Sequence, residues 1–362
     1  MNICIVAGAR PNFVKVAPII RAVERARKSR PDLCYTLVYA GKADDPTLEP
    51  SLFNDLQIPP PTVFLNVDSA SLNEITGRVM GEFEQYLLDH PTDVVIVVDD
   101  LASTMAAAIV TKKQGIRLAH LVAGTRSFDI RMPKEINRLV IDGLSDLLFT
   151  AGDGASNIAT REGANQSKIY KVGNILMDSL RFNHVRWTRP TSMDPLGLKE
   201  GNYIVFTLNR KALIADKVNL KAMVEAMVRQ AGEVPIVAPL RGKAAEVVTD
   251  INSQLSEGGI TVVAPLNYLD FGYLTAHALG VVTDSGNVAE EATFNSVPCI
   301  TLNSYTEHIE TVTVGSNVLV GEDPQLLGEH VARMVAHEWK ACGIPDRWDG
   351  RAAERIVQIL IG

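Results

Sequence analysis

The sequence is poor in the residues on which several classes of protein depend. It has four cysteines in 362 residues, and no two of them form a Cys-x-x-Cys pair, which argues against a zinc site or a disulfide framework. Cys4, Cys34 and Cys299 lie in apolar segments, so we expect buried, reduced thiols there. No apolar run reaches the roughly 18 residues that span a bilayer, so we expect no membrane partner.

Basic residues are also too few for a general nucleic-acid binder, because the net charge is −7. Local basic clusters can still hold a small anion. The first residues, "MNICIVAG", lack the basic region, long apolar core and cleavage site of a secretory signal, and we therefore expect a cytoplasmic protein. The length and a hydrophobic fraction of 46% suit about two globular domains.

Short apolar runs that alternate with helical patterns are what the chain has in abundance. In the first half they cover residues 3–8, 35–40, 94–98, 117–123 and 147–151, and in the second half 203–208, 234–239, 259–265, 278–284 and 298–302. Near-continuous apolar strands joined by helices are typical of parallel sheets covered on both faces. The sequence therefore predicts two doubly wound α/β domains.

A stretch rich in Pro, Gly and polar residues separates the two halves, as a domain junction does. We expect an N-terminal domain over residues 1–183, a linker over 184–201 and a C-terminal domain over 202–342. Residues 343–362 contain a last amphipathic helix.

Ligands of open α/β sheets bind beyond the carboxyl ends of the strands, so the loops there are the candidate sites. Arg10 and Lys15 flank a helix start at Pro11 and can meet an anion, or they are ordinary surface cations. Asp99 and Asp100 end a strand. One of them is a candidate helix N-cap, which leaves the other for a ligand or for proton transfer.

A similar loop in the second half reads "TDSGNVAEEA". Ser285 and Gly286 begin a helix and can bind a phosphate, and Glu291, one turn further on, can accept hydrogen bonds from ribose hydroxyls. The alternative is a capped helix with a solvated acidic face. Among the seven histidines, we expect His120 in the core and only His308 in a position to meet a ligand.

Seven segments, in the right order along nearly the whole chain, resemble the non-hydrolysing UDP-N-acetylglucosamine 2-epimerases. They are "GARPNFVKVAPII", "AHLVAGTRSFDIRMPKEINRLVIDGLSDLLF", "VGNILMDSL", "PLNYLDFGYL", "VVTDSGNVAEEA", "VPCITL" and "RWDGRAAERI". The resemblance implies a GT-B fold of two Rossmann-like domains with a UDP-sugar in the cleft, and a last helix that returns to the first domain. It also implies a homodimer, no cofactor and no metal.

The reaction that the resemblance implies interconverts UDP-GlcNAc and UDP-ManNAc by eliminating UDP and adding it back. Several matching positions keep the family's residue type. Asp100 matches the family's catalytic aspartate, and Glu291 matches its ribose ligand. Arg10 and Lys15 match the phosphate-side cations. Phe271 matches the residue near the uracil, and Ser285 and Gly286 match the diphosphate turn.

Other matching positions depart from the pattern. Val122 and Lys134 stand where the family has catalytic glutamates, and Asn209 stands for its catalytic histidine. Valine cannot titrate, asparagine transfers no proton at neutral pH, and lysine reverses the charge. Around the nucleotide, Arg241 lies in "LRGK", Asn287 replaces a glycine and His308 replaces an arginine.

Three hypotheses follow. In the first, the chain is a functioning epimerase that uses Asp100 with Asp99, Glu135 or His308. In the second it is a different enzyme, for transfer or hydrolysis of a nucleotide sugar, and in the third it is a non-catalytic binding subunit. In each, UDP or a UDP-sugar is the expected ligand. Its binding residues are expected to be Arg10, Lys15, Asn209, Arg210, Arg241, Phe271, Ser285, Gly286, Asn287 and Glu291.

Overall fold

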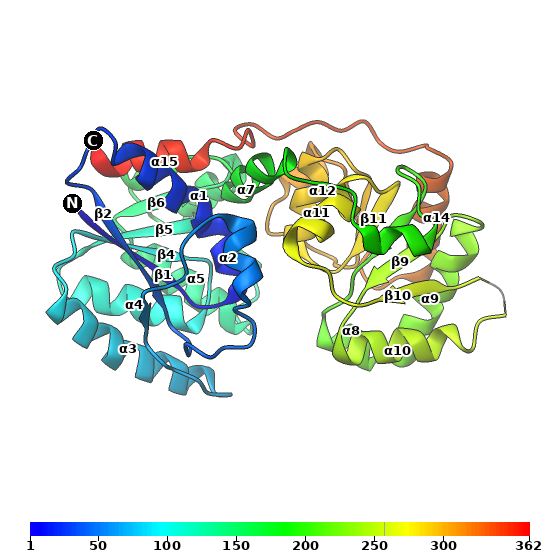
Figure 1. The fold of residues 1–362 in the computed structure, drawn as a ribbon, viewed down its shortest axis with the longest axis horizontal. Coiled ribbons are helices and arrows are strands. Elements are labelled where there is room, and N and C mark those ends of the chain that lie inside the picture. Colours follow the sequence, from blue (N-terminus) through cyan, green and yellow to red (C-terminus); the bar gives the residue numbers. More distant parts are fainter. Residues whose placement is uncertain (257) are drawn as a thin grey trace. The chain divides into compact units, whose positions relative to one another are not determined.

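The computed structural model describes residues 1–256 and 258–362 and divides them into two units. Unit 1 contains Met1–Phe182 and Asp346–Gly362, and unit 2 contains Asn183–Pro345. The segment 184–201 lies in unit 2, and the end of the chain belongs to unit 1. Each unit is a parallel sheet with helices packed around it (Figure 1).

The sheet of unit 1 has the order β3-β2-β1-β4-β5-β6-β7, and all its neighbouring strands are parallel. The order reverses between β1 and β4, which is where ligands of such sheets bind. The strands are β1 (Asn2–Ala7), β2 (Cys34–Tyr39), β3 (Val63–Phe64), β4 (Val94–Val98), β5 (Arg117–Ala123), β6 (Leu147–Thr150) and β7 (Ile169–Lys171).

The helices of unit 1 cover this sheet, and the C-terminal helix packs against the first one (Figure 1). They are α1 (Arg10–Ala26), α2 (Pro50–Leu56), α3 (Leu72–Asp89), α4 (Ala102–Lys113), α5 (Pro133–Leu144), α6 (Asp153–Arg161), the short 3-10 helix η1 (Gln166–Lys168), α7 (Ile175–His184), which runs into unit 2, and α15 (Ala352–Ile361).

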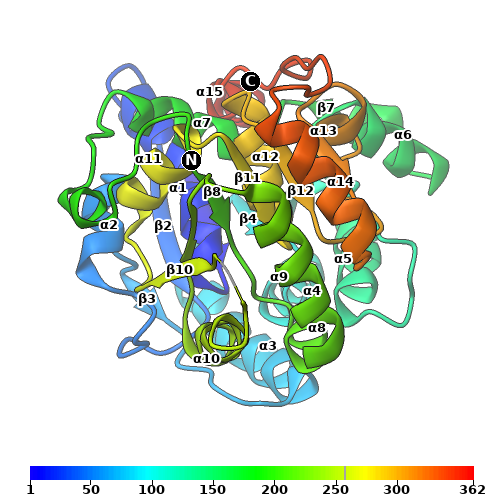
Figure 2. The ribbon, with the colours of Figure 1, turned by 90° about the vertical axis from the view of Figure 1, so that its right-hand side faces the viewer.

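Unit 2 repeats the same arrangement with the order β10-β9-β8-β11-β12-β13. Its strands are β8 (Ile204–Phe206), β9 (Ile236–Pro239), β10 (Ile260–Val263), β11 (Gly280–Thr283), β12 (Cys299–Thr301) and β13 (Asn317–Leu319). Its helices are η2 (Thr191–Leu196), α8 (Lys211–Ala215), α9 (Lys217–Ala231), α10 (Gly242–Asn252), α11 (Tyr268–Ala276), α12 (Gly286–Phe294), α13 (Glu310–Thr313) and α14 (Pro324–Val335). Helices α9 and α14 lie side by side (Figure 2).

These two sheets confirm the predicted fold class, because the central strands are buried on both faces. All five residues of β4 are buried, as a covered parallel strand requires. The prediction of a buried thiol is wrong for Cys34, which is exposed at the first residue of β2, whereas Cys4 and Cys299 are buried. Burial raises the pKa of the Cys299 thiol to about 12. All four cysteines are free.

Helix α1 contains a buried proline, Pro18, at an interior position. A proline has no N–H, so the carbonyl of Val14, four residues earlier, loses its helical partner. The hydroxyl of Ser179 in α7 donates to that carbonyl at 2.5 Å. The contact joins α1 to α7 and satisfies a backbone oxygen that the proline leaves open.

Candidate functional site

The carboxyl end of β4 places two aspartates at the edge of the first sheet. We expected one of them to cap the next helix, and this is wrong: Leu101 is the N-cap of α4, and the hydroxyl of Thr104 accepts from its backbone N–H at 3.0 Å. Asp99 has a φ of 59°, a left-handed conformation, so its carboxylate leaves the helix start. Both aspartates are therefore available for other contacts.

The carboxylate of Asp99 is held by two residues of α1. Asn12 donates to Oδ2 at 2.8 Å, and Lys15 lies 2.6 Å from Oδ1. Lys15, an expected anion ligand, is 8% exposed, and this ion pair fixes its ammonium group. Arg10, the other expected cation, is the first residue of α1 and is half-buried.

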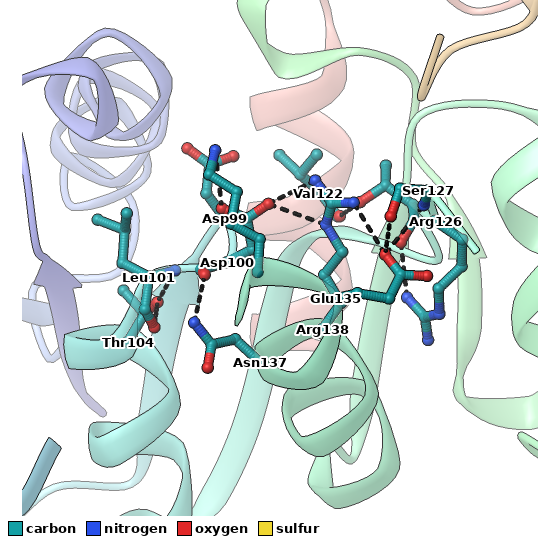
Figure 3. A network of polar contacts seen from close by, with 12 residues as sticks. Asp99, Asp100, Leu101, Thr104, Val122, Arg126, Ser127, Glu135, Asn137 and Arg138 are labelled. Carbon is teal, nitrogen blue, oxygen red and sulfur yellow. Dashed lines mark hydrogen bonds and ion pairs between the residues drawn. The ribbon is translucent and has the colours of Figure 1, made fainter. Parts of the chain in front are cut away.

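Asp100, the candidate catalytic carboxylate, lies against two cations of α5, and Figure 3 shows the contact with one of them, Arg138. Arg138 donates to Oδ2 from Nε at 2.8 Å, and its Nη2 lies 2.5 Å from the same oxygen. Lys134 has its Nζ 3.7 Å from Oδ1, and its side chain is 59% exposed. Asp100 is thus a buried carboxylate with one oxygen facing an exposed cation.

Glu135 occupies the first turn of α5 and is buried, with both of its oxygens in use. One accepts from the backbone N–H and the hydroxyl of Ser127, each at 2.9 Å, and the other from the N–H of Phe128 at 2.9 Å. Arg138 adds a bond at 3.1 Å. Burial alone would raise the pKa of Glu135, but these donors together hold it below its usual value. The carboxylate organises the loop before α5.

Val122 lies at the end of β5, where the resemblance places a catalytic glutamate. Its φ is 71°, and the pairing of β5 with β6 shifts register between Leu121 and Ala123. A β-branched residue in the left-handed region is a genuine outlier, and such strain is often found at functional sites. Gly124 follows with a φ of 75°, and a Cβ there would lie 2.3 Å from the carbonyl oxygen of Ala155.

Two buried arginines complete this edge. Arg126, in the loop after β5, is 3% exposed, and the sequence of this loop had marked it, with Lys134 and Glu135, as a residue that could define the chemistry there. It lies 2.8 Å from Asp142 Oδ2 and pairs with Glu162 at the end of α6. Sequence reasoning missed Arg138, which is 2% exposed. The spacing of Lys134 and Arg138, four residues apart on one helix, was the signal that could have placed Arg138 beside Lys134.

A cavity of about 470 Å³ opens at the same edge of the sheet, beside Leu101. Its size suits a small ligand or part of one. Its floor is apolar, from Val67, Ile75 and Val79, and its rim includes the ion pair of Lys42 with Asp68, in which Nζ and Oδ2 are 2.8 Å apart.

In unit 2, the turn after β11 leads into α12 at the expected place. Ser285 is the N-cap, without a cap bond from its side chain, and Gly286 is the first helical residue. The backbone N–H of Ser285 is bound by Thr283 Oγ1 at 3.0 Å. Gly286 is exposed, a Cβ there would meet nothing within 4 Å, and Asn287 follows half-buried. The helix start is therefore accessible to an anion.

The loop after β8 is fixed to the turn before Ser285. Asp284 Oδ2 accepts from the backbone N–H groups of Asn209 and Arg210 at 2.7 and 2.5 Å. The guanidinium of Arg210 bonds Asn303 at 2.7 Å and pairs with Glu322 at 2.5 Å. Arg210, an expected substrate ligand, thus joins three loops of unit 2.

Glu290 and Glu291 lie next to each other in α12 and are both buried. Burial, and then the charge of Glu290, raises the pKa of Glu291 to about 8. His308, in the loop after β12, is 7% exposed, and its Nε2 lies 3.7 Å from Glu290 Oε1. The imidazole and two carboxyl groups form a compact titratable cluster behind the turn of Ser285.

The remaining expected ligands of unit 2 are placed as follows. Phe271 is half-buried in the second turn of α11, and Arg241 is exposed as the N-cap of α10. Of the three candidate catalytic residues, Asp100 and Glu135 lie in unit 1 and His308 lies in unit 2.

Two features are absent from the part of the chain that the structure describes. Within residues 1–256 and 258–362, no helix combines the length and apolar character needed to cross a membrane. Over the same residues, no group of three or more His, Cys, Asp and Glu side chains could hold a metal ion.

Comparison with known proteins gives consistent matches. A family model described as UDP-N-acetylglucosamine 2-epimerase matches residues 25–361. The UDP-N-acetylglucosamine 2-epimerase of Methanocaldococcus jannaschii is 33% identical over 99% of each chain. The UDP-2,3-diacetamido-2,3-dideoxy-D-glucuronate 2-epimerase of Pseudomonas aeruginosa is 34% identical, also over 99% of each chain. The crystal structure of the M. jannaschii enzyme with UDP-GlcNAc and UDP has a TM-score of 0.84, covering 100% of this chain and 99% of that one.

Proposed function

Because the chain belongs to the UDP-N-acetylglucosamine 2-epimerase family, we propose that it binds a UDP-N-acetylhexosamine and retains at most a trace of 2-epimerisation. We assign nucleotide binding to unit 2, and we assign the residues that remain for sugar chemistry to the edge of unit 1 at Asp100. The crystal structure of the M. jannaschii relative with UDP-GlcNAc and UDP supports this ligand class.

The observation that carries the proposal is the accessible start of α12. Ser285 presents a free hydroxyl beside open backbone N–H groups, where the partial positive charge of the helix favours a diphosphate. Glu291 lies in the next turn of the same helix, where a carboxyl group can accept from ribose hydroxyls. The two groups together select a nucleoside diphosphate rather than an isolated phosphate.

The trace of 2-epimerisation that we propose is explained by the residues at the edge of unit 1. Each acid or base group contributes about a hundred- to ten-thousand-fold to the rate, and Val122 and Lys134 cannot replace two carboxylates. Asp100 is the carboxylate that remains for proton transfer, and we assign Glu135 to holding the Ser127 loop. His308 is the second candidate for proton transfer, through its contact with Glu290.

A second function is favoured by one contact. Lys134 places a cation 3.7 Å from Asp100, where the family pattern has a negative charge. A cationic edge stabilises a departing diphosphate and needs fewer acid or base groups. Transfer or hydrolysis of the sugar from a nucleotide is therefore the alternative to residual epimerisation.

Incubation of the purified protein with UDP-GlcNAc in D₂O separates these functions. Deuterium at C2 or UDP-ManNAc shows epimerisation. Free UDP or a transferred sugar without exchange shows the second function. Binding without turnover leaves a non-catalytic binding subunit, and calorimetry that detects no binding of UDP or of any UDP-sugar contradicts the proposal.

Point variants assign the roles. Arg10→Ala and Ser285→Ala should weaken UDP binding. Ser253→Ala, which removes an exposed hydroxyl bonded to Asp250, is the matched control and should not. Asp100→Asn should abolish turnover while UDP affinity stays unchanged; turnover equal to that of the wild type would refute the catalytic role of Asp100.

We also propose a cytoplasmic homodimer. Four exposed apolar residues on the loop before α5 and on α5 itself support the dimer: Phe128 is 75%, Ile130 61%, Ile136 46% and Leu139 40% exposed. Light scattering after size exclusion should give twice the mass of the chain, and Phe128→Ser/Ile130→Ser should give a monomer.

A further inference from the structure

His120 lies in the interior of the first sheet, directly behind the candidate catalytic edge. It is 1% exposed and belongs to β5. In the pairing of β4 with β5 it is opposite Val97, three residues before Asp100. Its ring therefore packs beneath the point where β4 ends, and nothing in the proposed reaction uses it.

Both ring nitrogens of His120 face hydrogen-bond acceptors. Nδ1 lies 2.6 Å from Asp142 Oδ1, and Nε2 lies 2.9 Å from the backbone carbonyl oxygen of Asp99. A carbonyl oxygen has no proton to donate, so Nε2 must donate one. The proton on the other side belongs either to Nδ1 or to the carboxyl group of Asp142.

The surroundings of Asp142 assign that proton to the ring. Its second oxygen lies 2.8 Å from Arg126 Nη2 and accepts from the N–H of Gly124 at 3.1 Å, which are the contacts of an ionised carboxylate. Burial would raise the pKa of Asp142, but the charges and hydrogen bonds of His120 and Arg126 hold it below its usual value. Nδ1 therefore donates as well.

The charges around the ring favour a cationic imidazole. Arg126 faces Asp142 from the loop after β5, and Glu162, whose side chain is 33% exposed, faces Arg126 from the end of α6. Beyond the Asp99 carbonyl, the carboxylate of Asp99 is already paired with Lys15 of α1. With a neutral His120, Arg126 alone would face two carboxylates, whereas an imidazolium adds a second positive charge beside the buried Asp142.

We propose that His120 is a buried imidazolium that positions Asp100 by holding the carbonyl of the Asp99–Asp100 peptide. The left-handed φ of 59° at Asp99 turns this carbonyl toward β5. The same peptide plane contains the nitrogen of Asp100, so the hydrogen bond from His120 fixes the direction in which the Asp100 side chain leaves the strand. The positioning role rests on the proposed function, whereas the charge of the ring does not.

Nitrogen NMR of the full chain with ¹⁵N-labelled histidine tests the charge. At pH 7.5 both ring nitrogens of His120 should show shifts and attached protons typical of an imidazolium. Exposed His337 gives the reference for a ring in water. A single protonated nitrogen in His120 would overturn the proposal. Asp142→Asn, which removes the carboxylate at nearly constant size, should return the ring to one proton.

A second experiment tests positioning. His120→Leu removes the donor for the Asp99 carbonyl, and it should reduce the turnover detected in D₂O about a hundredfold with UDP affinity unchanged. His120→Gln, which keeps a donor for this carbonyl, should lose less turnover. A parallel loss of UDP affinity would show a merely structural residue. His90→Gln, at an exposed position before β4 in the same unit, should change neither.

Failure of this inference can be distinguished from failure of the proposed function. If the wild type binds no UDP-sugar, the NMR result on the ring still decides the charge. In that case a crystal structure of His120→Leu, which lacks the donor, decides the positioning role: loss of the contact between Asp100 and Arg138 supports it, and an unmoved Asp100 refutes it.

Discussion

The backbone of Val122 is strained, because a valine side chain disfavours the left-handed conformation that it adopts. The left-handed region costs an L-residue about 1–2 kcal/mol, and more for a β-branched one, yet the residue sits there with a φ of 71°. The family pattern has a carboxylate at this position, which such a bend can aim away from the strand. The left-handed backbone therefore occurs at the position where the resemblance implies a catalytic glutamate.

Replacing Val122 with glycine should stabilise the protein. Glycine adopts positive φ without a steric penalty, and Val122 is only half-buried, so we expect the free energy of unfolding to rise by about 1 kcal/mol. Urea denaturation measures the change. Val63→Gly, at a half-buried position in the extended strand β3, is the control and should lose stability. A loss at both positions would mean that Val122 is not strained.

Glu291 gives nucleotide binding a dependence on pH. Burial and Glu290 raise its pKa from 4.5 to about 8, so the free protein holds a proton on it at pH 7. A ribose hydroxyl donates best to the ionised form. UDP affinity measured by calorimetry should therefore rise about tenfold between pH 7 and 9, with a proton released on binding at pH 7.

The same raised pKa has the opposite effect on folding. The folded state binds the proton more tightly than the unfolded state, so the contribution of Glu291 to stability is fully present below pH 4.5 and is lost as the pH rises through 8. Glu291→Gln should remove both the pH dependence of UDP affinity and this contribution to the pH dependence of stability. A wild-type UDP affinity that is flat over this pH range would show that Glu291 does not contact the nucleotide.

The sequence predicted the places of single residues in the fold better than it predicted the side chains that they contact. Ser285 and Gly286 begin a helix, as the pattern indicated, and His120 is in the core. The ion pair of Lys15 with Asp99 was not foreseeable, because those residues are 84 positions apart and meet only through the order of β1 and β4. The left-handed φ of Asp99 has no sequence signal either.

At the element scale, α1 and α7 depend on each other through one hydroxyl. Ser179 donates to the Val14 carbonyl that Pro18 leaves without a helical partner. Ser179→Ala should therefore lower the free energy of unfolding by about 1–3 kcal/mol, the cost of an unsatisfied buried carbonyl. Pro18→Ala restores the missing N–H, so the serine substitution should cost less in that background.

A double-mutant cycle by thermal or urea unfolding measures this coupling. Ser29→Ala, which removes an exposed hydroxyl bonded to Ala26, is the control and should change stability little. Equal costs of Ser179→Ala with and without Pro18 would show that the hydroxyl does not substitute for the missing N–H.

The elements that the sequence did not reveal share one property. β3, β7 and β13 are edge strands of two or three residues, and none lies in an apolar run of four residues or more. The longer runs of the central strands arise because those strands are covered on both faces, and an edge strand lacks that requirement. Pattern alone finds the middle of each sheet and, among the edge strands, only β10, which lies in the predicted run 259–265.

At the scale of the whole molecule, the departures from the family pattern gather at one kind of place. Val122 ends β5, Lys134 opens α5, and Asn209 follows β8, all at carboxyl edges of the two sheets. The strands behind them remain buried and parallel. The fold was predictable because its signal is spread over many core positions, whereas activity depends on a few edge residues.

If only those edge residues changed, restoring them should restore chemistry. The variant Val122→Glu/Lys134→Glu/Asn209→His should gain 2-epimerisation of UDP-GlcNAc, seen as deuterium at C2, by at least about a hundredfold, since each group contributes that much or more. The backbone at Val122 already has the required bend. The control with glutamine at all three positions has similar shape and hydrogen bonding but cannot transfer protons, so it should gain nothing. If the restored variant binds UDP-GlcNAc but no deuterium enters at C2, the backbone at these sheet edges no longer holds the three side chains in a catalytic arrangement.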